Sequence, residues 1–266
     1  DSLEADSDDA CLIRVASRQF QKAVRVSEEW VAEHARVTAV AQSVWEKSRA
    51  ENNFELFRPH LERIVELKQE YSSFFTPYAH IYDPLLDDFE PGLLTKDVQT
   101  IFSVLRQEQV KLIQAIAACP QVDSSFLHLN FPEQKQLDFG VEVMNRLGYD
   151  WEHGRQDKSV HPFTTSLGFG DVRITTRVDE DYLPMALFGS IHECGHALYE
   201  QGLSPTLFRT PLADGASMAI HESQSRMWEN LVGRSHPFWT CFFPRLQQAF
   251  PAQLGNVQLE TFYWGI

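Results

Sequence analysis

The chain has 266 residues and a formal net charge of −14 at pH 7. A protein this acidic is not expected to bind nucleic acid or an anionic membrane surface, because both carry negative charge. No apolar run approaches the roughly twenty residues that cross a bilayer, so we expect no membrane-spanning segment. The four cysteines show no paired spacing, which is typical of a protein of the reducing cytoplasm.

Apolar side chains recur at helical intervals through most of the first 150 residues. We therefore interpret residues 1–150 as a helical segment that forms one wall of a cleft. Gly148 is expected to end its last helix, since glycine readily adopts the left-handed conformation found there. The predicted helices are 11–47 with a second start at Ser27, then 57–75, 96–118 and 131–147.

Two short stretches after this helical segment are the convincing strand candidates, Ser159–Thr164 and Phe169–Arg177. The second alternates Val172, Ile174 and Thr176 with polar neighbours, as a half-buried strand does. We expect the two to form a hairpin beside the helix that follows. An extended segment at the edge of a cleft can hold a peptide substrate by backbone hydrogen bonds.

The next helical stretch contains the pattern His-Glu-x-x-His, as His192, Glu193 and His196. Histidines four apart lie on one face of a helix, where both imidazoles can bind one metal ion. Apolar neighbours predict that this helix is buried, running from Pro184 to a stop at Gly202. Burying three such polar groups without partners costs several kcal/mol, and metal ligation explains their presence. Glu193 remains free to act as general base.

Zinc used in hydrolysis normally takes three protein ligands and keeps a fourth position open. The next helix-like run, residues 216–229, begins after Asp214-Gly215 as a plausible cap and closes near Gly233. If the two helices pack antiparallel, Glu222 faces the histidine pair and is the predicted third ligand. Glu229, two turns further along, is either a competitor for that role or a partner that orients a histidine.

Three more residues are predicted to contact substrate, although each has a structural alternative. Arg173 could bind a substrate carboxylate through two hydrogen bonds from its guanidinium group, or it could pair with Asp171 and stiffen the cleft wall. His161 could line the cleft or orient another group, and His221 could stabilise an oxyanion or simply pack.

Cys194 is interpreted as a small buried residue, because on the helix it points away from the ligand face.

Four motifs in this order resemble the thermostable carboxypeptidase family typified by the Thermus aquaticus enzyme, peptidase family M32. The resemblance implies a mainly α, gluzincin-like zinc-peptidase fold with a short hairpin beside the metal-binding helix. It also implies that His192, His196 and Glu222 bind the metal and that Glu193 is the general base. The motifs are His161-Pro162-Phe163, Asp171-Val172-Arg173-Ile174-Thr175, His192-Glu193-Cys194-Gly195-His196 and His221-Glu222-Ser223-Gln224.

The resemblance further implies a carboxypeptidase of broad specificity, acting on peptides with a free C-terminus. It implies zinc as the metal, with cobalt also accepted, and a cytoplasmic homodimer when the protein is full length. Residues 151–266 would be the catalytic segment, continuous with residues 1–150 in one peptidase domain. Family members are about twice as long, with further N-terminal and C-terminal portions. Two alternatives stay open: a zinc oligopeptidase that cuts internally, and an inactive metal-binding fragment.

Overall fold

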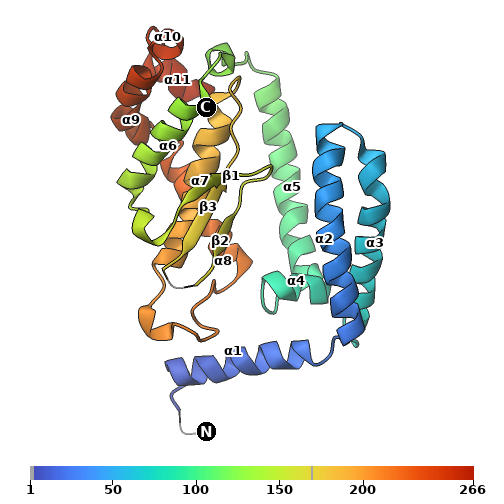
Figure 1. Ribbon diagram of the computed structural model, residues 1–266. Helices are drawn as coiled ribbons and strands as arrows, with labels where there is room; N and C mark the ends of the chain where they lie inside the picture. The colour runs from blue at the N-terminus through green and yellow to red at the C-terminus, as the bar shows by residue number, and fades with distance from the viewer. Residues whose placement is uncertain (1–2, 169) are drawn as a thin grey trace. The chain divides into compact units, whose positions relative to one another are not determined.

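The structure, a computed structural model, describes residues 3–168 and 170–266. Phe169, expected to begin the second strand, lies outside the described residues. The fold is mainly helical with one small sheet (Figure 1), which confirms the expected fold class. The chain divides into two compact units, one ending at Leu112 and the other running from Ile113 to Ile266. The functional division expected near residue 150 stays a prediction.

The first unit is built from helices, and the side chain of Ser27 starts one of them. Its hydroxyl accepts the Trp30 N–H at 3.2 Å, which is the second helix start that the sequence indicates. Helices α2 and α3 pack together, and the Trp30 indole donates to the Leu67 carbonyl at 3.0 Å. The helices are α1 (Asp8–Ala23), α2 (Glu28–Ala50), α3 (Phe54–Ser73), α4 (Asp83–Phe89) and the beginning of α5 (Thr95–Ala117).

The second unit holds every residue predicted for the site. Gly148 ends α6 with φ of 98°, in the left-handed region that favours glycine, and Gly202 caps α7. Its helices are α6 (Glu133–Leu147), α7 (Leu183–Gln201), α8 (Met218–Arg226), the π-helix η4 (Met227–Val232), α9 (His236–Ala249), α10 (Pro251–Leu254) and α11 (Leu259–Gly265), with 3-10 turns η1 (Ser125–His128), η2 (Trp151–His153) and η3 (Pro205–Leu207).

A three-stranded sheet lies against α7 (Figure 1). Strands β2 (Thr164–Ser166) and β3 (Val172–Thr176) pair antiparallel, so a hairpin forms. Its first strand lies later than the expected Ser159–Thr164 and shares only Thr164 with it; Pro162 has no backbone N–H to donate to a strand partner. A further strand, β1 (Gln156–Lys158), runs parallel to β3 on its other side, giving the order β1-β3-β2. The sequence did not indicate β1, because three polar residues show no strand periodicity. The order leaves β2 at an edge.

Helix α7 is the element against which the rest of this unit packs. It contacts α6, α8, η4, β2 and β3. On one side Leu187 and Ile191 join an aromatic-rich core that contains the fully buried Trp239 of α9. On the other side Cys194 and Ala197 pack on the sheet. Because neighbours cover nearly all of its surface, α7 is apolar almost all round and holds its polar groups rigidly.

Hydrogen bonds between polar side chains tie the sheet to α7. Ser190 donates to the Thr176 hydroxyl at 3.0 Å and accepts from the Gln156 amide at 3.0 Å. The Tyr149 hydroxyl, just after α6, donates to the Val172 backbone carbonyl at 2.7 Å and so ties the sheet to the end of α6. Buried polar groups of this kind specify how two elements align, because leaving them unpaired is costly.

Within the described residues, no helix has the length and apolar character that crossing a membrane requires.

Candidate functional site

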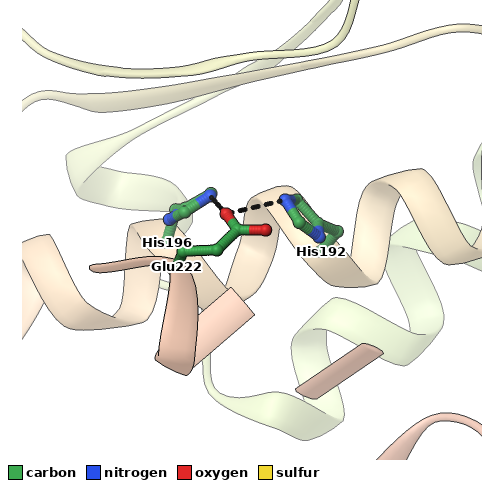
Figure 2. Close-up of side chains that lie close together, drawn as sticks. All are labelled: His192, His196 and Glu222. Atoms are coloured by element: carbon green, nitrogen blue, oxygen red, sulfur yellow. Dashed lines mark ion pairs between the residues drawn. The ribbon is translucent and has the colours of Figure 1, made fainter. Parts of the chain in front are cut away.

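The three predicted ligands come together where α7 and α8 meet. Figure 2 shows the imidazoles of His192 and His196 projecting from α7 toward the carboxylate of Glu222. Glu222 Oε2 lies 3.6 Å from His192 Nε2 and 3.3 Å from His196 Nε2. Two ligand atoms each about 2.1 Å from a tetrahedral ion lie about 3.4 Å apart. The donor set and its spacing therefore fit one ion of zinc's size, with a fourth position left for a reactant.

A glycine in the middle of the motif allows α8 to approach this closely. A Cβ added at Gly195 would lie 2.7 Å from the Ser225 Cα and 2.9 Å from the Gln224 carbonyl oxygen. Contacts that short require the α8 backbone to move away. Since Glu222 sits on the same turn of α8, the small residue at position 195 is what places this carboxylate within reach of the histidines.

Helix α8 begins later than the sequence indicates. The expected cap at Asp214-Gly215 is wrong: the Ser217 side chain accepts the Ile220 N–H at 3.2 Å and caps the helix. Asp214 instead accepts the N–H of Gly215 at 2.7 Å, which is a local turn contact. The result is a short helix whose first turns carry His221 and Glu222.

The Glu222 carboxylate is oriented by its own helix. Arg226 Nε donates to Oε1 at 2.7 Å, and the hydroxyl of the buried Ser225 lies 3.1 Å from Oε2. Burial alone would raise the pKa of this carboxyl, but the hydrogen bond from Arg226 and the charge of His192 hold it below its ordinary value. Glu222 is therefore ionised at neutral pH, which is the form that binds a metal.

Glu229 contacts the back of one ligand. Its Oε2 lies 2.9 Å from His192 Nδ1, the ring nitrogen opposite the one that faces Glu222. It belongs to the π-helix η4, whose wider turn shifts it from the face that α-helical spacing gives. Of the two roles that the sequence left open for Glu229, this geometry favours the partner that orients a histidine.

The other ligand histidine is backed by two side chains in series. His196 Nδ1 lies 2.6 Å from His221 Nδ1, and His221 Nε2 lies 2.8 Å from Glu200 Oε1. Burial, together with His221 and His192, lowers the pKa of His196 to about 4, so its imidazole is neutral at pH 7. The sequence interpretation missed Glu200, although it stands four residues after His196 on the same helix face.

Glu193 is buried beside the ligands, with 6% of its surface exposed. Its Oε2 lies 2.7 Å from the Thr164 hydroxyl, so strand β2 fixes the carboxylate. Burial raises the pKa of Glu193, and this outweighs the lowering by Thr164, His192 and His161. A carboxylate with a raised pKa accepts a proton more readily at neutral pH, as a general base must. Thr164 was missed as a site residue because a strand threonine has no distinctive spacing.

Two other predicted site residues, Arg173 and His161, and the Cys194 of the motif are not among the three that could hold a metal ion. Arg173 forms a two-point pair with Asp171, at 2.8 and 2.7 Å, which is the structural alternative considered for it. His161 is exposed, and its charge lowers the pKa of Glu193. Cys194 is fully buried, and burial raises the pKa of its thiol to about 12. Such a thiol is not an effective nucleophile, as the sequence interpretation held.

Two glycines of α7 offer a matched test of the close approach to α8. We expect Gly195→Ala to lower the free energy of unfolding by about 1–3 kcal/mol, as overpacking does, and to weaken Zn²⁺ binding. Gly189→Ala is the control, because its added Cβ meets nothing within 4 Å. It should stabilise the helix by about 0.5–1 kcal/mol and leave Zn²⁺ binding unchanged. Urea unfolding and chelator competition measure both effects; equal behaviour of the two variants would contradict the packing role of Gly195.

Comparison with known proteins agrees with this arrangement. The chain is 40% identical over 270 residues to "Thermostable carboxypeptidase 1" of Thermus thermophilus, covering 98% of this chain and 53% of that protein. It is 38% identical over 263 residues to "Carboxypeptidase 1" of Bacillus subtilis, covering 98% and 52%. The fold matches the crystal structure of the M32 carboxypeptidase from Deinococcus radiodurans R1 with a TM-score of 0.89, at 39% identity, covering 100% and 53%.

The chain thus spans about half the length of the curated relatives it matches. The family model described as Carboxypeptidase Taq (M32) metallopeptidase matches residues 1–266. The chain belongs to the M32 metallopeptidase family.

Proposed function

We propose that this chain carries the catalytic site of a metal-dependent carboxypeptidase that removes single residues from peptide C-termini with broad specificity. The observation that supports this most is the convergence of His192 Nε2, His196 Nε2 and Glu222 Oε2, with Glu193 buried beside them. Two imidazoles and a carboxylate suit zinc, and cobalt accepts the same donors. Relatives named as carboxypeptidases support the choice of peptides as substrates.

Each site residue has a distinct task in this proposal. His192 and His196 would hold the metal through Nε2, and Glu222 would hold it through Oε2. When bound, the ion supplies Lewis acidity that polarises the scissile carbonyl. Glu193 accepts a proton from the attacking water and returns it to the departing nitrogen. The contact with Thr164 keeps the Glu193 carboxylate from rotating away between these two steps.

The hairpin next to α7 is the proposed substrate wall. Strand β2 lies at the sheet edge, so an extended peptide can pair with its backbone. Arg173, on β3, uses Nε and Nη2 for Asp171, and we assign Nη1 to the substrate carboxylate. His161 would line the same wall near Glu193. For the full-length protein, a cytoplasmic homodimer remains part of the proposal.

The product pattern on one peptide tests the activity directly. We expect the Zn²⁺-loaded chain to shorten a peptide with a free C-terminus one residue at a time and to leave its amidated twin intact. Mass spectrometry follows both. Internal fragments from the amidated peptide would instead establish an oligopeptidase. An intact free peptide, with one ion bound per chain, would identify an inactive metal-binding chain, which is the alternative that the half-length match to relatives keeps open.

Replacing the proposed base separates turnover from metal binding. Glu193→Gln keeps the size of the side chain but cannot take a proton, so we expect kcat to fall by about 10²–10⁴. Zn²⁺ affinity should stay at the level of the unmodified chain, because Glu193 is not a ligand. The exposed Glu152 provides the control, and Glu152→Gln should change neither quantity. Full turnover by Glu193→Gln would remove Glu193 from the mechanism.

Two glutamates about two helical turns apart, Glu222 and Glu229, distinguish a ligand from an orienting partner. We expect Glu222→Gln to weaken Zn²⁺ binding by more than about 100-fold, and Glu229→Gln by about 10–100-fold, the cost of losing a group that orients a ligand. Competition with a chelator of known affinity gives both values. The reverse order would make Glu229 the third ligand, and unchanged binding by Glu222→Gln would show that Glu222 is not one.

A further inference from the structure

We propose that His221 and Glu200 are positioning residues that fix the tautomer of His196 and so keep its Nε2 free for a metal ion. This role rests on the proposed metal site and gives His221 a task different from substrate contact. The observation behind this proposal is a row of three side chains in contact behind the ligand atoms. The row runs from His196 on α7 to His221 on α8 and back to Glu200 on α7.

The row is short and largely enclosed. The His196 and His221 Nδ1 atoms lie 2.6 Å apart, and His221 Nε2 lies 2.8 Å from Glu200 Oε1. The side chains of His196, His221 and Glu200 are 13%, 19% and 10% exposed. Groups so poorly hydrated need hydrogen-bond partners within the protein. Each ring nitrogen in the row must therefore be matched, donor to acceptor.

Only one arrangement of protons on neutral imidazoles satisfies both hydrogen bonds of the row. An ionised Glu200 accepts and does not donate, so the proton of His221 must sit on Nε2. His221 Nδ1 is then an acceptor, and His196 must place its own proton on Nδ1 to donate to it. This leaves an unprotonated Nε2 on His196, and Nε2 is the atom that lies 3.3 Å from Glu222 Oε2. Glu200 thus sets the tautomer of a ligand that it does not touch.

The opposite arrangement breaks one hydrogen bond and misplaces the proton of His196. A proton on His221 Nδ1 would leave Nε2 bare, with its lone pair facing the Glu200 carboxylate. It would also make His196 Nδ1 the acceptor and move the His196 proton to Nε2, where it blocks the metal. On the other ligand, His192, a single carboxylate does the same task, since Glu229 contacts Nδ1 directly at 2.9 Å.

Packing holds the His221 ring in the orientation that this relay needs. The Tyr199 ring meets it edge to face, with centroids 5.0 Å apart. On a further side, a Cβ added at Gly215 would lie 2.8 Å from His221 Cδ2, so the chain passes close to the ring edge. A ring confined in this way cannot easily turn to exchange its two nitrogens.

Variants at position 221 separate the acceptor from the shape of the ring. His221→Phe keeps an aromatic ring but removes both nitrogens, so His196 Nδ1 loses its acceptor. His221→Asn places the amide oxygen near the position of Nδ1 and can accept the same proton. The matched control is the exposed pair His236 and Glu260, joined at 2.7 Å in the same unit and remote from the ligands in sequence. His236→Phe removes an equivalent contact there.

Zinc affinity and the site of protonation are the two measurements on the full chain. We expect His221→Phe to weaken Zn²⁺ binding by about 10–100-fold, His221→Asn to recover most of the loss, and His236→Phe to match the unmodified chain. In ¹H–¹⁵N spectra recorded before and after Zn²⁺ loading, His221 should carry its proton on Nε2 and His196 on Nδ1 in both states. The metal-free state is the readout that a purely structural role would not fix, because an ion bound to Nε2 by itself leaves only Nδ1 for the His196 proton.

Three results would overturn the proposal in different ways. A proton found on His221 Nδ1 would reverse the relay. Unchanged Zn²⁺ affinity in His221→Phe, with the unmodified chain binding one ion, would remove the positioning role and leave the proposed function intact. No Zn²⁺ binding by the unmodified chain would refute the proposed function itself, and the relay with it.

Discussion

The site depends on how closely α7 and α8 approach each other. Backbone atoms of Gln224 and Ser225 lie where any side chain at position 195 would have to be. This contact brings Glu222 within 3.3 Å of one histidine and 3.6 Å of the other. A displacement of α8 by the size of a methyl group would separate the carboxylate from both imidazoles. The close packing of the two backbones is therefore what brings the three candidate ligands together.

Burial then determines which polar atoms of α7 remain free to face a metal ion. Helix α7 is covered by α6, α8, η4 and the sheet, so its polar groups must find partners from those neighbours. Strand β2 holds Glu193 through Thr164, η4 holds His192 through Glu229, and α8 holds His196 through His221. The ligand atoms that face one another are those left outside these contacts. A site supported on every side in this way keeps its geometry without relying on the metal.

The histidine pair and several helix ends could be predicted from the sequence, because the residues that determine them are close together in the chain. The spacing of His192 and His196 follows from helix geometry, and Gly148 and Ser27 mark helix ends by their backbone and capping chemistry. Features that depend on contacts between distant residues could not be predicted from the sequence. Strand β1 forms because it pairs with β3. Its three polar residues have no periodicity from which a strand could be predicted. The π-turn that redirects Glu229 and the relay behind His196 are tertiary contacts, visible only once α7 and α8 are packed. The M32 motifs pointed to the three candidate ligands, which the structure brings together, but not to the side chains that orient them.

X-ray absorption at the zinc edge of the metal-loaded chain would test the central claim most directly, because it reports ligand types without requiring turnover. The account predicts one ion per chain, coordinated by two imidazoles and a carboxylate oxygen at about 2.0–2.2 Å, with room for one further light atom. A sulfur ligand at about 2.3 Å would place the ion on a cysteine instead. That result, or a first shell lacking two imidazoles, would contradict the site as described.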